Sequence, residues 1–405
     1  MVVFVFYFLR FTIDRKNTHC FAASLNCFAA SRAGLIKCAR IARVKLPWRA
    51  KSLNKFRETL LGWFRAGRKD YPWRRDRDPY RVWLAEIMLQ QTRIAAVIPY
   101  YEKFLRRFPD IQALADGEPR EVLCYWAGLG YYSRARNLHR AAREIAEQYG
   151  GSFPSNFDSA LKLPGIGSYT AAAVLSIAFD APHAVVDGNV ARVIARLLAV
   201  RGDLRESARW SMLQRAAQAM LATEAPGDWN QALMELGEIV CTPRSPRCSE
   251  CPLAKWCKAR KRDLVDVIPA PRRRQQTVRQ KLAAAVLVDP QRHTLLVRDQ
   301  GRHDEVLFSR MWQFPAVEVR EKAQQELAHH LENDLQFAAP ALDELKHAKH
   351  AVTFRDITLV PFLGRVTRLP DLPRSRRLPL AQLSRLAVSS ATHKIARAAL
   401  AALNA

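Results

Sequence analysis

Residues 163–171 read LPGIGSYTA, between two segments whose apolar residues have helical spacing. Gly165 and Gly167 stand two positions apart, and glycine tolerates the backbone angles of a tight turn. The stretch therefore predicts a hairpin between two helices, with backbone N–H groups pointing outward where the second helix begins. Such groups can hold a phosphate with help from the helix dipole. The alternative is a helix–helix turn that binds no ligand.

A second motif follows this hairpin. Residues 185–193 read VVDGNVARV, and Asp187 stands where a helix would take its N-cap. The two valines before it indicate that the carboxylate is partly buried. A capping aspartate at the mouth of a cleft can also face a developing positive charge. From the residues alone, a purely capping role and a catalytic role both remain open.

The cysteines divide into a scattered group and a clustered group. The scattered ones are Cys20, Cys27, Cys38 and Cys124, and the clustered ones are Cys241, Cys248, Cys251 and Cys257. A disulfide framework is typical of short secreted chains, so the tetrad predicts a metal site in a reducing compartment. Four thiolates suit either tetrahedral zinc or an iron–sulfur cluster.

The chain is predicted to be mainly α. From Ser52 to about Ile239 the helical pattern is broken only by Gly and Pro, which predicts an all-α domain of roughly ten helices over residues 51–260. A basic linker over 261–280 leads to a smaller α+β domain over 281–400. Its expected elements are strands at Leu282–Val288, Thr294–Val297, Met311–Phe314 and Val352–Val360, and a polar helix near Lys322–Leu335.

The charge balance favours a polyanionic partner. The 405 residues include 64 Lys and Arg against 38 Asp and Glu, a net charge of +26, and basic side chains that neutralise phosphates release counterions. A protein that is merely basic is the alternative. No stretch approaches the ~20 apolar residues of a membrane helix. Residues 1–50 are expected to be a basic extension: a disordered tail, a targeting segment, or residues upstream of the true start.

The hairpin motif and the VDGNV motif, at this separation, resemble those of the helix–hairpin–helix DNA glycosylase superfamily. Within it, the 6-2-5 spacing of the cysteine tetrad matches the 4Fe–4S loop of the endonuclease III and adenine glycosylase branches. The resemblance implies a 4Fe–4S cofactor on Cys241, Cys248, Cys251 and Cys257, with a structural and phosphate-facing role. Gly165 and Gly167 would contact the DNA backbone.

Two features distinguish the branches. The lyase-active branch has a lysine directly before the threonine of the hairpin motif, where this chain has Tyr169; without that amine no Schiff base forms, so the resemblance implies hydrolysis. The segment from Pro72 to Thr92 (PWR, then DPYRVWLAEIMLQQT) closely resembles the adenine glycosylase, or MutY-type, family, in which this helix carries the catalytic glutamate. That residue is Glu86, whose apolar neighbours would raise its pKa and keep a proton available.

Further matches to this family supply the remaining candidates. The loop GLGYYSRAR (residues 128–136) places Tyr131 as a wedge into the base stack, and NQALMELG (230–237) matches the helix that lines the adenine pocket. The candidate catalytic residues are Glu86, Asp187, Tyr169 and Asn189. The candidate substrate- and DNA-binding residues are Trp73, Arg74, Gln91, Thr92, Leu129, Tyr131, Gly165, Gly167, Gln231, Glu235 and Thr353.

The C-terminal domain resembles the Nudix-like (MutT-like) module with which this family inspects the opposite base. It lacks the glutamate-rich helix that magnesium-dependent nucleotide hydrolysis needs. Where the family has a Phe-Ser-His loop that reads the damaged guanine, this chain has Val352-Thr353-Phe354. Thr353 keeps a hydrogen-bonding group, but the family's phenylalanine is lost from its position.

The resemblance implies a monofunctional glycosylase that hydrolyses the bond between deoxyribose and adenine mispaired with 8-oxoguanine or guanine. The alternatives are an endonuclease III-like glycosylase and lyase acting on pyrimidine lesions, and a non-catalytic iron–sulfur protein that binds DNA. We expect a monomer that binds duplex DNA and no membrane. In a bacterium it would be cytoplasmic and associated with the nucleoid; in a eukaryote it would be nuclear or mitochondrial.

Overall fold

The structure is a computed structural model that describes residues 46–270, 277–298, 311–352, 355–386 and 388–404. The described residues fall into two compact units. Unit 1 holds residues 46–82, 89–93 and 167–270, and unit 2 holds 83–88, 94–166 and the described part of 277–404. The expected extension over residues 1–50 lies almost wholly outside the described residues. The domain boundaries 51–260, 261–280 and 281–400 stay a prediction.

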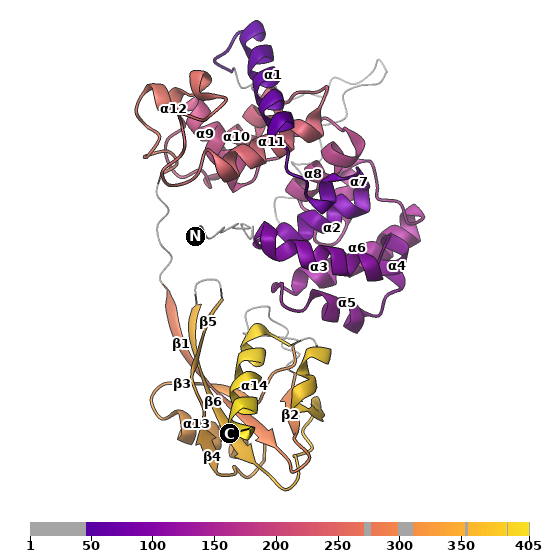
Figure 1. Ribbon diagram of the computed structural model, residues 1–405, viewed down its shortest axis with the longest axis vertical. Coiled ribbons are helices and arrows are strands. Elements are labelled where there is room, and N and C mark those ends of the chain that lie inside the picture. Colours follow the sequence, from indigo (N-terminus) through magenta and orange to yellow (C-terminus); the bar gives the residue numbers. More distant parts are fainter. Residues whose placement is uncertain (1–45, 271–276, 299–310, 353–354, 387, 405) are drawn as a thin grey trace, which may run out of the picture. The chain divides into compact units, whose positions relative to one another are not determined.

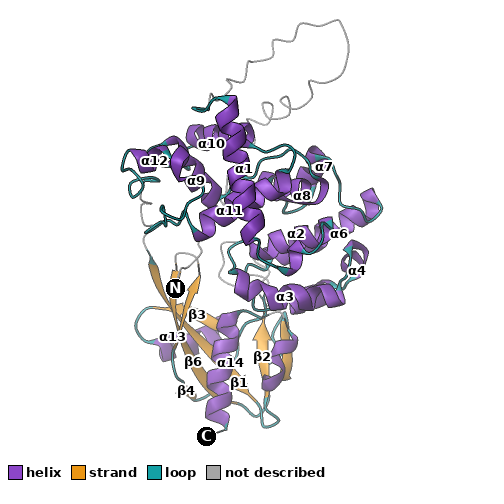
Figure 2. Cartoon of the chain, turned by 45° about the horizontal axis from the view of Figure 1, so that its top comes forward, coloured by secondary structure: helices purple, strands orange, loops and turns teal. Residues whose placement is uncertain are grey.

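Helices fill the chain from residue 50 to residue 261. Their bounds are α1 Ala50–Gly67, η1 Pro72–Arg74, α2 Pro79–Leu89, α3 Ile94–Arg107, α4 Ile111–Asp116, α5 Pro119–Trp126, α6 Ser133–Tyr149, α7 Phe157–Lys162, α8 Ser168–Phe179, α9 Gly188–Leu198, α10 Ser207–Met220, α11 Pro226–Ile239, η2 Ala254–Trp256 and α12 Lys258–Lys261. Figure 2 shows helices throughout this part of the chain and strands only after it.

Local sequence explains where several of these helices begin and end. Asp78 caps α2, because its Oδ1 accepts from the backbone N–H of Arg81 at 2.8 Å and Pro79 takes the first helical position. Gly150 ends α6 in the left-handed conformation, with φ of 59°. Both signals were readable in the sequence: Asp78 sets the start of the helix that carries Glu86, and Gly150 sets the end of α6.

The core of unit 1 is aromatic at its centre. Phe56 on α1 packs against Trp229 on α11 and against Trp256, with ring centroids 5.7 and 5.6 Å apart. The apolar stripe of α9, from Val190 to Leu197, is buried in the same cluster. This packing joins the helix that begins at Asp187 to the segment that carries the cysteines.

The C-terminal part of unit 2 is a seven-stranded sheet flanked by helices. Its strands are β1 Val278–Val288, β2 His293–Val297, β3 Ala316–Val319, β4 Leu342–Glu344, β5 Ala348–Val352, β6 Arg355–Arg365 and β7 Ser375–Pro379. The order is β4-β6-β1-β2-β7, with β3 paired to β1 and β5 to β6; β1 and β6 run parallel from Val278–Arg355 to Val288–Arg365.

Helices cover both faces of this sheet. Alternate residues of β1 enter two different apolar clusters, one containing Ala284 and Val286 and the other Ala283 and Ala285. The first cluster is completed by α14 (Ser390–Leu403), which Figure 1 shows against the sheet, and the second by α13 (Ala323–His329). The central strand is therefore apolar throughout its second half, as expected when neither face meets water.

The expected fold class, a mainly helical chain followed by a smaller α+β domain, is confirmed. One predicted strand was wrong, and a second one crossed the boundary between two strands. Met311–Phe314 makes only isolated bridges at Trp312 and Gln313. Val352–Val360 was predicted as one strand; its described residues are the last residue of β5 and the first residues of β6, two strands that pair antiparallel. The predicted helix near Lys322–Leu335 is α13 followed by a π-helical turn, His330–Asp334.

No helix among the described residues is both long enough and apolar enough to cross a membrane.

Candidate functional site: a buried aspartate, a polar cluster and a cysteine loop

The hairpin at residues 163–167 requires a glycine at position 165. Gly165 has φ of +77°, and a Cβ there would lie 2.7 Å from Cβ of Asn137 on α6. Ile166 donates its N–H to the carbonyl of Leu163 at 3.1 Å, which closes the turn. α8 follows with Gly167 as its N-cap, in an extended conformation that any residue could adopt. The two glycines therefore serve different purposes: Gly165 permits the turn, and Gly167 leaves the start of α8 without a capping side chain.

Asp187 is both the N-cap of α9 and a buried carboxylate. Its Oδ1 accepts from the N–H of Val190 at 2.7 Å, and its Oδ2 accepts from Nδ2 of Asn189 at 3.3 Å. The residue is 8% exposed, and burial raises the pKa of its carboxyl despite these donors. The capping interpretation is thus correct, and it leaves one carboxylate oxygen facing Asn189 rather than the helix.

Two side-chain amides that no sequence pattern selected hold the extended segment before Asp187. Asn230 on α11 accepts from the N–H of Val185 at 3.1 Å and donates to the carbonyl of His183 at 2.8 Å. Gln218 on α10 accepts from Ala184 at 3.0 Å and donates to Pro182 at 2.8 Å. Both side chains satisfy backbone groups of residues 182–185, so they fix the direction from which the chain reaches Asp187.

Arg192 ties Asn189 to the cysteine loop. Its Nη2 donates to Oδ1 of Asn189 at 2.9 Å and to the carbonyl of Gly237 at 2.8 Å, while Nε donates to the carbonyl of Cys241 at 2.8 Å. Helices α9 and α11 can approach this closely because residue 237 is glycine; a Cβ there would lie 2.8 Å from Cβ of Asn189. A continuous set of hydrogen bonds therefore runs from Asp187 through Asn189 and Arg192 to Cys241.

A second group of polar side chains lies in the same unit. Arg74 forms an ion pair with Glu235 on α11, Nη1 to Oε2 2.8 Å, and both side chains are largely buried. Trp73 is buried and stacks on Tyr71 with centroids 5.3 Å apart. Gln231, one turn before Glu235, is buried and donates to the carbonyl of Gly227 at 3.2 Å. The structure thus brings together Arg74 and Glu235, which the sequence places far apart.

One carboxylate beside this group was missed. The pKa of Glu238 is raised by burial and further by the negative charges of Glu235 and Asp187, while Lys69 and Arg74 lower it. It stands three residues after Glu235 on α11, and only that helical spacing could have pointed to it.

Tyr169 and the residues after α2 also fall in unit 1. Tyr169 donates its hydroxyl to Sδ of Met234 at 3.3 Å. Gln90 donates to Oγ1 of the buried Thr170 at 3.4 Å. Gln91 adopts a left-handed φ of 58°, and Thr92 donates to the carbonyl of Gln90 at 3.3 Å. The end of α2 is therefore anchored to the first turn of α8, directly after the hairpin.

Glu86 and Tyr131 belong to unit 2. Glu86 lies on α2 between the buried Ala85 and Ile87 and is itself partly buried. Tyr131 is 42% exposed and has a left-handed φ of 48°, whereas Leu129 of the same loop is buried. An exposed aromatic ring on a constrained loop suits insertion into a base stack. Thr353 lies outside the described residues.

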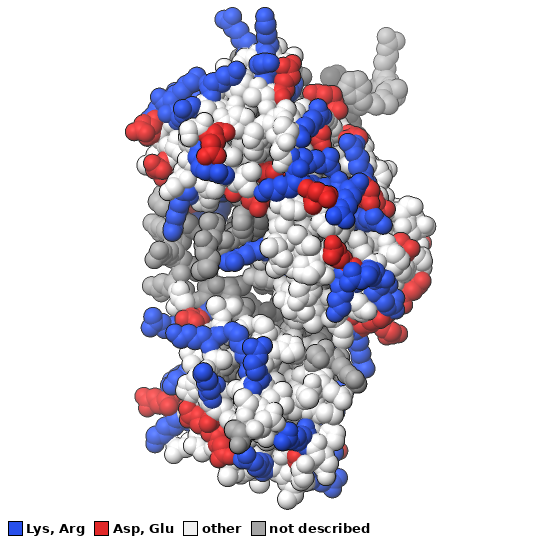
Figure 3. Space-filling model, viewed as in Figure 1, with Lys and Arg blue, Asp and Glu red and all other residues white. Residues whose placement is uncertain are grey.

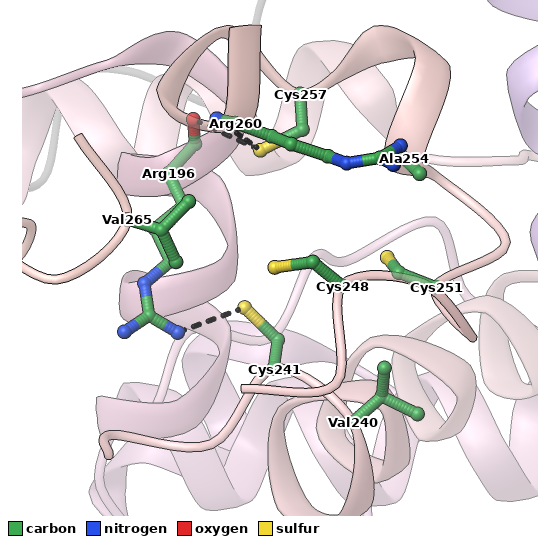
Figure 4. Close-up of a pocket in the computed structure, with 9 residues that line it drawn as sticks. All are labelled: Arg196, Val240, Cys241, Cys248, Cys251, Ala254, Cys257, Arg260 and Val265. Carbon is green, nitrogen blue, oxygen red and sulfur yellow. Dashed lines mark hydrogen bonds between the residues drawn. The ribbon is translucent and has the colours of Figure 1, made fainter. Parts of the chain in front are cut away.

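The four predicted cysteine ligands line one cavity. Figure 4 shows the sulfurs of Cys241, Cys248, Cys251 and Cys257 around a common hollow, with Arg196 beside them. Among the described residues, no three His, Cys, Asp or Glu side chains are grouped tightly enough to hold a single metal ion. A 4Fe–4S cluster needs no such grouping, because each of its irons takes one thiolate.

Electrostatics around this cavity also suit a cluster. Burial raises the pKa of Cys251 to about 12, so its thiol loses a proton readily only when a metal binds the sulfur. Arg196 is 1% exposed; it donates to Sγ of Cys241 at 3.3 Å and to the carbonyl of Thr242 at 2.7 Å. A cation buried at this position fits an anionic group held by four thiolates.

Basic side chains are abundant on the molecular surface. Figure 3 shows Lys and Arg over much of the visible face, with fewer acidic side chains between them. This distribution agrees with the net charge of +26 and with a phosphate-rich ligand.

Two parts of the chain match known protein families. Residues 84–219 match the family described as HhH-GPD superfamily base excision DNA repair protein, and residues 241–257 match the iron-sulfur binding domain of endonuclease III. The fold, the hairpin and the cysteine loop together define a helix–hairpin–helix base-excision repair protein with a 4Fe–4S cluster.

Individual relatives indicate to which family within this superfamily the chain belongs. The chain is 33% identical over 269 residues to an adenine DNA glycosylase of Buchnera aphidicola subsp. Acyrthosiphon pisum, covering 66% of this chain and 76% of that protein. It is 45% identical over 219 residues to the adenine DNA glycosylase of Homo sapiens, covering 52% of this chain and 40% of that one. The chain belongs to the adenine DNA glycosylase family.

The match spans less than half the length of the human relative. Among solved structures, a thermostable thymine-DNA glycosylase is 32% identical to this chain, with a TM-score of 0.49, and the match covers 52% of this chain and 98% of that one.

Proposed function

We propose that this protein is a monofunctional DNA glycosylase that removes adenine paired with 8-oxoguanine or guanine, acting in base excision repair. The observation that carries the proposal is Asp187, a buried carboxylate with two hydrogen-bond donors at the start of α9. Such a group, held rigid and away from water, can stabilise positive charge that develops on deoxyribose as the glycosidic bond breaks.

Glu86 is the proposed general acid. Adenine leaves readily only after its ring is protonated, and Glu86 is a partly buried carboxyl on α2 among the buried residues Ala85, Ile87 and Met88, so we assign it this proton transfer. Once ionised, the same carboxylate can activate the attacking water. Asn189 positions Asp187 through its hydrogen bond, and Tyr169 supplies no amine, so the reaction ends in hydrolysis rather than a Schiff base.

The pocket residues would recognise the extruded adenine. The buried Arg74–Glu235 ion pair offers both donors and acceptors to the edges of a base, and Trp73 and Gln231 provide a flat ring and an amide beside it. Tyr131 would fill the space in the base stack, and Leu129, Gln91 and Thr92 would contact DNA near it. Gly165 and Gly167 would bring backbone N–H groups to a phosphate.

The C-terminal sheet domain is proposed to read the opposite base, with Thr353 as a hydrogen-bonding residue. The 4Fe–4S loop would position basic residues against the DNA backbone and hold α9 through Cys241. We propose that the protein acts as a monomer.

Single-turnover release of adenine from A:8-oxoguanine, A:G and A:T duplexes tests the proposal. We expect release from the first two, and a loss of at least about a hundredfold in Glu86→Gln and in Asp187→Asn, the usual range for a lost acid or electrostatic partner. Asp203→Asn, an exposed aspartate on unit 1, is the control. Rates near wild type in either site variant contradict the mechanism.

Two further measurements separate the alternatives. Borohydride trapping of the protein on a thymine-glycol duplex would favour a lyase acting on pyrimidine lesions. Tight binding of the A:8-oxoguanine duplex without adenine release would favour a non-catalytic DNA-binding protein.

A further inference from the structure

A half-buried arginine connects the end of α2 to the loop that carries Tyr131. Arg134, in the first turn of α6, donates from Nη1 to the carbonyls of Ile87 and Met88 at 2.8 and 3.0 Å. Its Nη2 donates to the carbonyls of Leu129 and Gly130 at 3.2 and 3.3 Å. One guanidinium therefore bonds two backbone segments that lie forty residues apart in the sequence, and all five residues belong to unit 2.

The position of these carbonyls shows which parts of the chain Arg134 holds together. Ile87 and Met88 lie in the last turn of α2, where carbonyls have no partner within the helix. Ile87 directly follows Glu86, so the guanidinium fixes the part of the helix that carries the proposed general acid. The carbonyls of Leu129 and Gly130 belong to the two residues before Tyr131.

The aromatic surroundings reinforce the same link. The guanidinium carbon of Arg134 lies 5.4 Å from the ring centroid of Tyr131 and 5.4 Å from that of Trp126. Trp126 in turn donates from Nε1 to the carbonyl of Gly130 at 3.1 Å. The loop is thus bonded through its backbone, while the Tyr131 ring stays 42% exposed.

We propose that Arg134 is a positioning residue that couples the insertion of Tyr131 into DNA to the placement of Glu86. A displacement of Tyr131 moves the carbonyls of Leu129 and Gly130, and the shared guanidinium transmits that movement to α2. Arginine suits this role because its planar fork presents several N–H donors in fixed directions, which the single ammonium of lysine cannot do. This inference rests on the proposed function of Tyr131 and Glu86.

A first experiment needs no DNA. Hydrogen–deuterium exchange is measured on the full chain as wild type, Arg134→Lys and the control Arg143→Lys, an exposed arginine on the same helix. We expect Arg134→Lys to raise exchange about tenfold both in residues 127–131 and at the end of α2, because the charge-assisted bonds to both segments are lost. Faster exchange in only one segment, or in neither, overturns the coupling.

A second experiment measures the coupling on DNA. Fluorescence of 2-aminopurine beside the target adenine reports unstacking, and single-turnover adenine release reports chemistry. We expect Arg134→Lys to lower both about tenfold, while Arg143→Lys leaves both unchanged. In a Tyr131→Ala background, the same substitution should lower the rate less than about twofold, since residues acting through one another are not additive.

The two experiments distinguish the possible failures. Independent, multiplicative effects of Arg134→Lys and Tyr131→Ala overturn the coupling even if adenine is released normally. If the wild-type protein releases no adenine from any duplex, the proposed function fails, and the exchange measurement still decides whether Arg134 joins the two segments.

Discussion

Arg192 donates its Nε hydrogen to the backbone carbonyl of Cys241 at 2.8 Å, so the helix that begins at Asp187 is bonded to the first residue of the iron–sulfur loop. Its Nη2 reaches Asn189 and Gly237 at the same time. The position of the candidate catalytic carboxylate therefore depends on the integrity of a loop that lies more than forty residues further along the chain.

Arg192→Lys should weaken both ends of this connection. A lysine keeps the charge but cannot bond Cys241, Asn189 and Gly237 together, and each charge-assisted hydrogen bond contributes about 1.5–3 kcal/mol. We expect adenine release to fall at least about tenfold and the iron content per chain to decrease. Iron analysis and single-turnover rates are the measurements, with Arg201→Lys, an exposed site, as control. Full iron content together with a normal rate contradicts the link.

Gly237→Ala should separate α9 from α11. The added Cβ would lie 2.8 Å from Cβ of Asn189 and 3.1 Å from its backbone, and backbone cannot move aside cheaply. We expect a loss of about 1–3 kcal/mol in the free energy of unfolding, measured by urea titration. Gly62→Ala, in the middle of α1 with nothing near its Cβ, should instead add about 0.5–1 kcal/mol. Equal changes in the free energy of unfolding for the two variants would refute the close approach of α9 and α11.

Gly165→Ala and Gly167→Ala should differ in their effect on DNA binding. The first meets Asn137 and a φ of +77°, whereas the second has open space and an ordinary backbone conformation. We expect at least an about tenfold rise in Kd for the first, the effect of losing one or more charged-group hydrogen bonds, and little change for the second. Fluorescence anisotropy at one fixed salt concentration measures both. Similar affinities for the two variants would mean that the hairpin does not contact DNA.

Asp187→Asn should make stability less dependent on pH. Burial raises the pKa of Asp187 above its ordinary value of 3.8, so the protonated carboxyl favours the folded state at low pH. That contribution is lost as pH rises through the raised pKa. Asparagine does not ionise, so the variant should have the higher Tm near neutral pH, with the difference shrinking toward zero below about pH 4.

Asp203→Asn is the control, because this substitution should change the Tm near neutral pH in the opposite direction. Hydrogen bonds from Arg205 lower the pKa of this exposed carboxyl to about 2, so its contribution is present near neutral pH and is lost as pH falls. The variant should have a slightly lower Tm at pH 7, and the small size reflects exposure to solvent. A Tm difference of the same sign for both variants would contradict the assignment of burial as the cause at Asp187.

Local patterns in the sequence were sufficient for part of the site. The hairpin at Gly165, the capping position of Asp187 and the cysteine spacing each lie within one short window, so residue type and spacing specify them. The roles of Asn230, Gln218 and Arg192 could not be read in this way. Apart from Asn189, their partners lie 34–54 residues away, and only the packing of the helices brings them together.

In the sheet domain, too, local sequence patterns predicted only part of the structure. β1 was predictable because all of its second half is apolar, whereas no residue type near Val352 showed that one strand ends there and that another begins at Arg355. Residues 311–314 have strand-like composition yet make only single bridges, because the pairing partner of a segment is a property of the fold and not of its own residues.

Arg196 has a consequence for how the protein matures. In a newly made chain the cysteine loop closes over a guanidinium that is almost cut off from water, in the same cavity as a Cys251 thiol whose pKa is raised by burial to about 12. Backbone carbonyls solvate that cation but do not neutralise it, so an open loop costs less free energy until iron and sulfide arrive. We expect closure of the loop to follow uptake of the cofactor, so that chains without the cluster are cut faster by proteases between residues 242 and 257.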